Sequence, residues 1–395
     1  MHIGFDISQT GVGKAGCGYF ADAMAGAMIS NAPQHRFSLY PSFGDSFFDY
    51  RMPLFNPYRA SNTHYGPRHL TREGARKFWL RDDLEANLNN PDIIHSNNFW
   101  LPMQIASSRL IYTLYDLGFV IDPNWSTERN RLRCFDGLFK SSLVADWVVA
   151  ISEYSRASYL KTFPHFPEER IRVVYPCSRF TDTTRNGSRP DKIPHLGNAE
   201  FWLSVGTIEP RKNQRLLVKA YADYLASGGR PMPLVLAGGM GWMMKDFSQY
   251  IADLGIADKV ILLGYVSDDE MIWLYRNCYA HLYPSVFEGF GLPVLEGMLF
   301  GAPTLCSDTT SLPEVAGDAA ILVSPARIGD WIDAMRAIAD STETRQTYAV
   351  AARERASKFD RNRSAAAVLE IYREAVSLPK RIDSRQTSTL LGQSA

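Results

Sequence analysis

The chain has no excess of charge of either sign, because its 42 lysines and arginines match its 42 aspartates and glutamates. Without a global positive field, nothing draws the chain to a polyanion, and we expect no nucleic-acid partner. No apolar run approaches the ~18 residues that a bilayer span needs. The first residues, MHIGFDI, have a strand pattern with no basic region followed by an apolar one, so we expect no signal peptide. Together these absences predict a cytoplasmic protein.

Cysteine is scarce and scattered. An odd number of cysteines without C-x-x-C spacing argues against a disulfide framework or a zinc cluster and fits a reducing compartment. The five are Cys17, Cys134, Cys177, Cys278 and Cys306. The sequence also has no Asp-x-Asp pair and no His/Cys cluster. We therefore expect no metal site and no cofactor.

Short β-branched or aromatic runs alternate with helix-length amphipathic stretches along all 395 residues. This alternation predicts parallel sheets covered on both faces, and the length suits two such domains. Expected strands in the first half are residues 1–7, 37–43, 92–98, 110–117, 147–152 and 171–176. Those in the second half are residues 201–208, 234–239, 259–266, 278–286, 303–308 and 319–325.

A polar stretch between the halves, SRFTDTTRNGSRPDKIPHLGN, has two prolines, two glycines and no periodicity, which is typical of a linker. The predicted organisation is α/β, with two doubly wound, Rossmann-like domains facing each other across a cleft. We place the N-terminal domain at residues 1–180, the linker at 181–198 and the C-terminal domain at 199–364. A last amphipathic helix at 365–378 is expected to pack back toward the N-terminal domain, and a tail at 379–395 has little to bury and is expected to be disordered.

The stretch FEGFGLPVLEGM, residues 287–298, places two carboxylates at a turn of the kind that usually receives an anion. An expected strand ends near Val286, and Pro293 suits the first turn of a helix, whose free N–H groups favour a phosphate. A carboxylate binds phosphate poorly but accepts two hydrogen bonds from a diol. Glu288 and Glu296 together with those N–H groups therefore suit a nucleotide sugar. The alternative is an acidic residue that merely stabilises the helix dipole.

A second turn carries complementary charge. In SVGTIEPRKNQRLL, residues 204–217, Arg211 and Lys212 follow another expected strand. Lysine is a compact charge suited to a diphosphate, and arginine adds a planar fork. A solvated surface pair is the alternative, but two strand ends with matched chemistry make it less attractive.

These motifs resemble the retaining glycosyltransferases of family 4, which have the GT-B fold. The resemblance rests on VGTIEPRKN, LAGG, VFEGFGLPVLEGMLFGAPTLCSD and LPEVAGDAA, and extends more faintly to HSNNFWLP, TLYDL and ISEYSR in the first half. In such enzymes the C-terminal domain binds the nucleotide sugar and the N-terminal domain binds the acceptor.

The resemblance implies specific donor contacts. Glu288 would hold the donor sugar, Glu296 the ribose, and Lys212, with Arg211 nearby, the diphosphate. The base would lie beside Tyr265 and Val266. Backbone N–H groups for the phosphate and sugar would come from Gly289, Phe290, Gly291 and Leu292.

On the acceptor side the resemblance points to Tyr115 and Asp116, with Asp116 as the candidate for assisting the acceptor proton or holding the acceptor. Many relatives carry histidine where this chain has Tyr115, and some carry arginine where it has Thr207. His95 ends an expected strand and is either a cleft residue or a satisfied core histidine. The predicted catalytic set is therefore Glu288, Asp116 and Lys212.

Residues 11–16 spell G-x-G-x-x-G after a strand, the fingerprint of dinucleotide binding. The loop is looser than that fingerprint needs, and the acidic residue expected ~20 positions further on is missing. Of the two interpretations, we prefer a loop in which Gly11 and Gly13 face the cleft to a loop that binds nicotinamide.

Two further groups have ordinary explanations. An aromatic set could stack on sugars, although a core role is commoner; it comprises Phe99, Trp100, Tyr112, Tyr115 and Phe119. Arg129, Arg131 and Arg133 alternate near a helix start, where a solvated face is the commoner explanation and a lipid-binding patch the other. Peripheral attachment at the cytoplasmic face of the inner membrane is therefore also considered.

The overall prediction is a retaining, metal-independent glycosyltransferase that acts on a glycan or lipid-linked glycan acceptor in surface polysaccharide synthesis. VGTIEPRKN with HSNNFWLP is similar to members that use mannose or related sugars, which makes GDP-mannose the leading donor. The alternatives are a nucleotide-sugar epimerase of the same fold, a nicotinamide-dependent dehydrogenase using the Gly11–Gly16 loop, and a non-catalytic sugar-binding protein.

Overall fold

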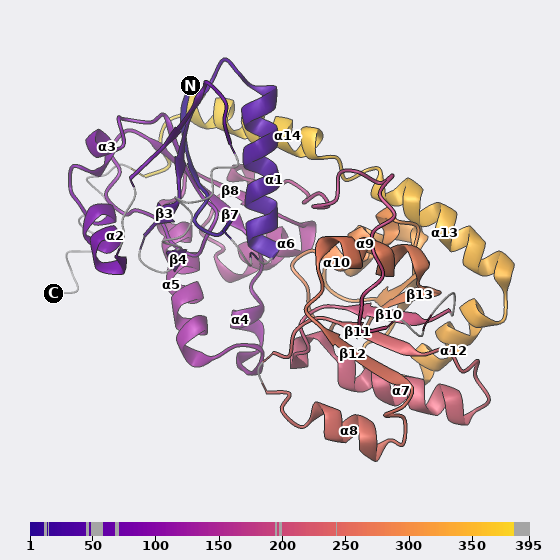
Figure 1. Ribbon diagram of the computed structural model, residues 1–395. Helices are drawn as coiled ribbons and strands as arrows, with labels where there is room; N and C mark the ends of the chain where they lie inside the picture. Colours follow the sequence, from indigo (N-terminus) through magenta and orange to yellow (C-terminus); the bar gives the residue numbers. More distant parts are fainter. Residues whose placement is uncertain are drawn as a thin grey trace. The chain divides into compact units, whose positions relative to one another are not determined.

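The computed structural model describes residues 1–11, 14, 16–44, 47–48, 58–67, 71–193, 196, 200–241 and 243–382. The chain forms two compact units (Figure 1). Unit 1 contains Met1–Arg179 and the chain from Asp360 onward, and unit 2 contains Phe180–Phe359. Each unit is built on a parallel sheet with helices, as the alternating pattern predicts.

Unit 1 has a seven-stranded parallel sheet in the order β5-β2-β1-β6-β7-β8-β9. Its strands are β1 (His2–Asp6), β2 (Arg36–Tyr40), β5 (Thr63–Tyr65), β6 (Ile93–Ser96), β7 (Arg109–Leu114), β8 (Trp147–Ala150) and β9 (Ile171–Val173). The short strands β3 (Ser42–Phe43) and β4 (Phe47–Phe48) pair antiparallel. The helices are α1 (Gly16–Asn31), α2 (Arg72–Trp79), α3 (Leu84–Asn87), α4 (Gly118–Ile121), α5 (Glu128–Val144), α6 (Glu153–Thr162) and α14 (Arg361–Ser377), with short 3-10 turns at Pro123–Trp125 and Glu168–Arg170.

Unit 2 has a six-stranded sheet in the order β12-β11-β10-β13-β14-β15, in which every pair is parallel. Its strands are β10 (Trp202–Val205), β11 (Leu234–Ala237), β12 (Val260–Gly264), β13 (Ala280–Tyr283), β14 (Thr304–Ser307) and β15 (Ile321–Val323). The helices are α7 (Gln214–Ala226), α8 (Phe247–Asp253), α9 (Asp268–Asn277), α10 (Leu292–Leu299), α11 (Leu312–Ala316), α12 (Ile328–Ala339) and α13 (Thr342–Ala356), with 3-10 turns at Pro210–Lys212 and Gly317–Ala319.

All twelve expected strands are confirmed. Most are shorter than predicted, but β2 and β7 begin one residue before the predicted start, and 37–43 divides into β2 and β3. Two strands were missed, β4 and β5. Of these, β5 is a three-residue edge strand that is not fully buried, so it carries no continuous apolar run. Central strands such as β10 are buried at every position, which is why their sequences are almost uninterrupted apolar runs.

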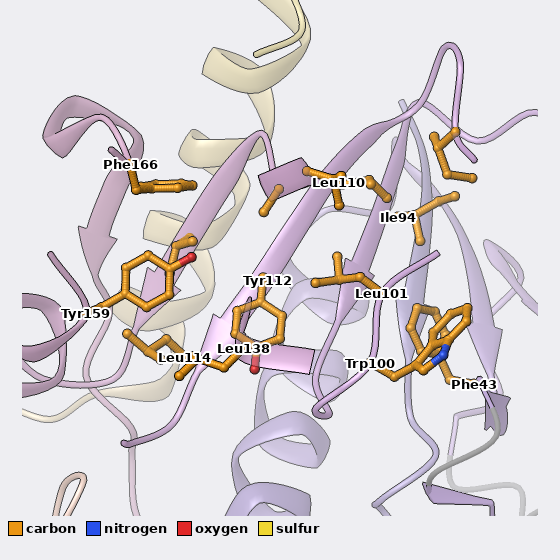
Figure 2. Close-up of a cluster of buried hydrophobic side chains, with 14 of the residues drawn as sticks. Phe43, Ile94, Trp100, Leu101, Leu110, Tyr112, Leu114, Leu138, Tyr159 and Phe166 are labelled. Carbon is orange, nitrogen blue, oxygen red and sulfur yellow. The ribbon is translucent and has the colours of Figure 1, made fainter. Parts of the chain in front are cut away.

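The core of unit 1 lies between the sheet and the helices that cover it. Leu110, Tyr112 and Leu114 alternate along β7 and join one buried cluster with Leu138 of α5 (Figure 2). The expected aromatic set belongs mostly to this core. Trp100, Tyr112, Tyr115 and Phe119 are buried, and Phe99 is half-buried.

The C-terminal helix α14 belongs to unit 1 and packs against α1 (Figure 1). Beyond it, Lys380 donates a hydrogen bond to the carbonyl of Ile105 at 2.7 Å, and the backbone of Arg381 donates to Asp146 at 2.8 Å. The side chain of Arg381 also donates hydrogen bonds to carbonyls at the C-terminal end of α5. Lys380 and Arg381, which belong to the tail expected to be disordered, are therefore bonded to the rest of unit 1. Residues 383–395 lie outside the described part of the chain.

Much of the expected linker belongs to unit 2 and is bonded to α9. The backbone of Ser188 donates to the carbonyl of Asp269, and Arg276 donates to the carbonyls of Arg185 and Thr183. Residues 194, 195 and 197–199 lie outside the described part. Among the helices that the structure describes, none is both long and apolar enough to cross a bilayer.

Candidate functional site

The candidate site lies where the strand order of unit 2 reverses. β10 and β13 are neighbours at the centre of the sheet, and the chain leaves β10 toward β11 on one side and β13 toward β14 on the other. In doubly wound sheets, ligands bind outside the carboxyl ends of strands at this switch point. The segment after β10 carries Arg211 and Lys212, and the segment after β13 carries Glu288.

Backbone contacts join these two segments. The amide of Val286 donates to the carbonyl of Arg211 at 2.9 Å, and the side-chain amide of Asn213 donates to the carbonyl of Pro284 at 3.2 Å. Asn213 has a left-handed φ of 59°, which lets the chain turn from the 3-10 turn at Pro210–Lys212 directly into α7. The two turns therefore form one bonded assembly.

Glu288 is the centre of the charge cluster. Lys212 Nζ lies 2.6 Å from its Oε1, Arg211 lies 3.1 Å from its Oε2, and the hydroxyl of Tyr283 donates to Oε1 at 2.8 Å. The Glu288 side chain is only 8% exposed. Burial by itself would raise the pKa of Glu288, but Lys212 and Arg211 outweigh it and lower that pKa to about 2. Glu288 is therefore a carboxylate at neutral and mildly acidic pH.

The loop after Glu288 is held by hydroxyl groups. The amide of Glu288 donates to Thr310 Oγ1 at 3.1 Å, and Ser311 Oγ donates to the carbonyls of Glu288 and Phe290. Gly291 has a φ of 103°, and a Cβ there would lie 2.6 Å from Leu312. Only glycine suits this position, and the loop leads straight into α10.

Helix α10 begins at Leu292 and has Pro293 in its first turn, as the sequence predicts. Glu296 lies one turn into this helix and is 4% exposed. The hydroxyl of Tyr275 donates to Glu296 Oε2 at 3.4 Å. At the turn after β12, Tyr265 is 80% exposed and Val266 half-buried.

Two members of the cluster were not predicted from the sequence. Glu209 is buried and pairs with Arg211 at 2.9 Å, so Arg211 lies between two carboxylates. Tyr283 ends β13 and contacts both Lys212 and Glu288. Glu209 could have been identified from the sequence, because it lies in the same turn as both cations. For Tyr283 no pattern distinguished its hydroxyl from that of an ordinary core tyrosine.

In unit 1, the expected acceptor-side residues Tyr115 and Asp116 follow β7, and His95 lies within β6. Asp116 is half-buried and accepts a hydrogen bond from the amide of Gly118 at 2.9 Å. Tyr115 is buried, and its hydroxyl donates to the carbonyl of Cys17 at 3.2 Å. Burial raises the pKa of Tyr115 well above its ordinary value, so its hydroxyl keeps its proton.

His95 is buried, and both ring nitrogens are engaged, Nε2 with Thr113 Oγ1 at 2.8 Å and Nδ1 with the hydroxyl of Tyr372. Burial lowers its pKa to about 3. Of the two interpretations of this residue, the geometry is that of a satisfied core histidine. Neither ring nitrogen is left for an acceptor.

A buried polar network connects this histidine to the end of β1. Thr113 Oγ1 donates to Asn97 Oδ1 at 2.8 Å, and the amide of Asn97 donates to Asp6 Oδ2 at 3.0 Å. Burial raises the pKa of Asp6 to about 7, although the amides of Ser8 and Asn97 oppose the shift. The network fixes the ends of β1, β6 and β7 relative to one another.

The glycine loop follows a turn closed by the amide of Thr10 and the carbonyl of Ile7, at 3.0 Å. Gly11 is half-buried, Gly13 lies outside the described residues, and α1 begins at Gly16. The four residues 7–10 therefore separate β1 from the first glycine, which is longer than the tight turn of a dinucleotide fingerprint.

The sequence matches two family descriptions. Residues 33–177 match "Glycosyltransferase Family 4", and residues 188–355 match "Glycosyl transferases group 1". Together these matches cover most of the chain. The chain belongs to the group 1 glycosyl transferases of family 4 and has the GT-B fold.

The relatives it resembles include O-antigen chain mannosyltransferase B of Escherichia coli, 33% identical over 59% of this chain and 61% of the relative. A serotype-specific mannosyltransferase WbdA of Escherichia coli is 34% identical over 92% of this chain and 48% of the relative. The chain thus spans about half to three fifths of these relatives. Among solved structures, Anabaena HepE in complex with UDP-glucose has a TM-score of 0.69 and 19% identity, covering 94% of this chain and 99% of that one.

Proposed function

We propose that the protein transfers a sugar from a nucleotide-sugar donor to a glycan or lipid-linked glycan acceptor in the synthesis of a surface polysaccharide. The observation that carries this proposal is the cluster of Lys212, Arg211 and Glu288 at the switch point of unit 2, in a chain of this family. Two cations and a carboxylate that is ionised at neutral pH, at the ligand edge of a parallel sheet, suit a diphosphate joined to a hydroxyl-rich sugar.

The donor contacts we propose are those implied by the motifs. Lys212 and Arg211 bind the diphosphate, together with backbone N–H groups from Gly289 to Leu292. Glu288 binds a sugar hydroxyl, and Glu296 binds the ribose diol. The exposed ring of Tyr265, with Val266 beside it, contacts the base. An ammonium has three donors, of which Lys212 directs one to Glu288 and one to Tyr283, so one remains for a phosphate oxygen.

The mechanism we propose is front-face displacement with retention of the anomeric configuration and without a metal ion. Charge grows on the leaving diphosphate as the bond to the sugar breaks, and Lys212, Arg211 and the N–H groups before α10 stabilise it. The leaving oxygen takes the acceptor proton, and Asp116 assists that proton or holds the acceptor.

GDP-mannose is the donor we propose. Its support is the mannosyltransferase names of the relatives in Escherichia coli and the motif pair VGTIEPRKN and HSNNFWLP. Because the HepE structure contains UDP-glucose, UDP sugars are tested as donors beside GDP-mannose.

The test is a donor screen followed by product analysis. A donor at ~100 times its dissociation constant adds about 2.7 kcal/mol to the stability of the protein, which a thermal shift detects. The stabilising donor is then incubated with a glycan acceptor, and the anomeric coupling of the product is read by NMR. Transfer with retention supports the proposal. An inverted product would discard the mechanism, and an epimerised donor without transfer would favour an epimerase.

We also propose that unit 1 attaches peripherally to an anionic bilayer through α5. Leu132, Phe135 and Phe139 lie on one side of this helix with exposed fractions of 59%, 43% and 43%, and the two phenylalanine rings stack 6.2 Å apart. Apolar side chains on a helix that also carries cations suit the interface of a bilayer with anionic headgroups. The cations are Arg129, Arg131 and Arg133.

A further inference from the structure

The hydroxyl of Tyr283 completes a triangle of polar atoms with Lys212 and Glu288. Lys212 Nζ is 2.7 Å from the hydroxyl, the hydroxyl is 2.8 Å from Glu288 Oε1, and Nζ is 2.6 Å from the same Oε1. Tyr283 is the last residue of β13 and is buried. A rigid strand therefore carries the hydroxyl, while both partners come from turns.

The direction of each hydrogen bond in the triangle follows from the chemistry of the groups. The ammonium of Lys212 can only donate, and the carboxylate of Glu288 can only accept. Burial and the neighbouring Glu288 charge raise the pKa of Tyr283 well above its ordinary value, so the phenol keeps its proton. The hydroxyl must accept a hydrogen bond from Lys212 and donate one to Glu288, and no rotated alternative satisfies all three groups.

This arrangement restrains Lys212, which has a flexible four-carbon stem. Its ammonium lies 5.1 Å from the centre of the Tyr283 ring as well as next to the hydroxyl. With the hydroxyl present, two acceptors on fixed positions direct two N–H groups and leave the third for a ligand. Without it, only Glu288 would hold the ammonium, and the ammonium could pivot about that single contact.

We propose that Tyr283 is a positioning residue that acts through Lys212, setting the direction of the ammonium toward the diphosphate of the donor. This inference rests on the proposed donor role of Lys212. It predicts that removing the hydroxyl damages function only while the Lys212 ammonium is present.

Tyr279 offers a matched control, four residues earlier in the same sequence. It is also buried, and its hydroxyl donates to the carbonyl of Ile338 at 3.1 Å, next to the C-terminal end of α12. Tyr279→Phe and Tyr283→Phe each delete one buried, hydrogen-bonded hydroxyl. A general loss of packing or stability should therefore appear in both variants.

The experiment is a double-mutant cycle with Tyr283→Phe, Lys212→Ala and the double variant, beside Tyr279→Phe. Turnover is measured at saturating donor, affinity for GDP and UDP by calorimetry, and melting temperature for each protein. Tyr283→Phe should lower turnover about tenfold, as expected for a lost hydrogen bond to a charged group. Tyr279→Phe should keep wild-type turnover, and the double variant should be no slower than Lys212→Ala.

The outcomes separate this inference from the proposed function. If wild type transfers sugar but Tyr283→Phe behaves like Tyr279→Phe, the inference is overturned and the transferase stands. The inference is also overturned if Tyr283→Phe lowers turnover by the same factor in wild type and in Lys212→Ala, because the effect of the hydroxyl would then not depend on the ammonium. If wild type transfers nothing, the proposed function fails, and the same cycle is read from nucleoside diphosphate affinity: additive losses overturn the inference and non-additive losses support it.

Discussion

Lys212 Nζ lies 2.6 Å from Oε1 of Glu288, although the two residues are 76 positions apart. Their side chains are only 12% and 8% exposed, so neither charge is well solvated. A buried pair of this kind is costly to break, because the partner that remains is an uncompensated charge. The pair therefore links the stability of unit 2 to the chemistry that we propose for its ligand edge.

The first prediction concerns acid stability. The pKa of Glu288 is lowered to about 2, so its carboxylate stabilises the folded state fully above its ordinary pKa of 4.5 and loses that contribution as the pH falls toward 2. The contribution is on the order of 3 kcal/mol. Glu288→Gln should be less stable than wild type at neutral pH, and the difference should shrink between pH 4.5 and 2. Urea unfolding of both proteins across this range measures it, and a pH-independent difference would contradict the assigned shift.

The second prediction concerns Glu296. If this carboxylate binds the ribose diol, Glu296→Ala should weaken the binding of the free nucleoside diphosphate and of the nucleotide sugar alike. Losing a hydrogen bond to a charged group should cost about 1.5–3 kcal/mol. Calorimetry with both ligands measures the effect.

Tyr275→Phe is an informative companion, because it removes the hydroxyl that contacts Glu296 and leaves the carboxylate in place. Its effect should be smaller than that of Glu296→Ala. Unchanged affinity of Glu296→Ala for the nucleoside diphosphate would remove the ribose role.

Most of the fold was predictable because buried parallel strands have a simple pattern. A strand such as β10 needs apolar residues on both faces, whereas the edge strand β5 contains Thr63, His64 and Tyr65 and has no such requirement. The end of the chain illustrates a second limit. Arg381 is a charged residue in a polar segment, yet it is held by carbonyls of α5 that only the folded structure brings near.

The candidate site was predictable in part for the same reason. Parallel strands end at one edge, so cations after β10 and a carboxylate after β13 were expected near one ligand. The direct pairing of these charges was not expected. A sequence pattern indicates which strand a residue follows, but it does not indicate where the end of its side chain lies. His95 shows the converse, since a polar residue at a strand end had two interpretations until its partners Thr113 and Tyr372 were known.

The third prediction concerns the membrane. Wild-type protein should sediment with vesicles of phosphatidylglycerol and phosphatidylcholine, and less with phosphatidylcholine alone, because the headgroup attraction is electrostatic. Phe135→Ser with Phe139→Ser should reduce sedimentation with the anionic vesicles. Val350, which is 55% exposed on α13 of unit 2, provides the matched control Val350→Ser. Equal binding by all three proteins would exclude α5 as the attachment surface.

The last prediction concerns Lys212 and separates catalysis from binding. Charge on the leaving oxygen increases as the sugar–oxygen bond breaks, so this cation should hold the transition state more tightly than the ground state. Lys212→Ala should therefore lower turnover at saturating donor by ~10²–10³-fold, while donor affinity falls much less. Lys212→Arg should restore activity only in part, because the planar fork is larger and cannot take the same two contacts with Tyr283 and Glu288.

Arg211→Ala is the comparison that assigns this role to one residue. Arg211 already lies between Glu209 and Glu288, which commits its guanidinium to two carboxylates and to the carbonyl of Phe287. We therefore expect Arg211→Ala to reduce stability and donor affinity more than turnover. If Lys212 were a solvated surface lysine, Lys212→Ala would change neither turnover nor donor affinity. If the protein only bound the donor, Lys212→Ala would weaken donor affinity and no turnover would be measured for any variant. If Arg211→Ala loses turnover and Lys212→Ala stays near wild type, the leaving phosphate is stabilised by the arginine, and the third N–H of Lys212 has another partner.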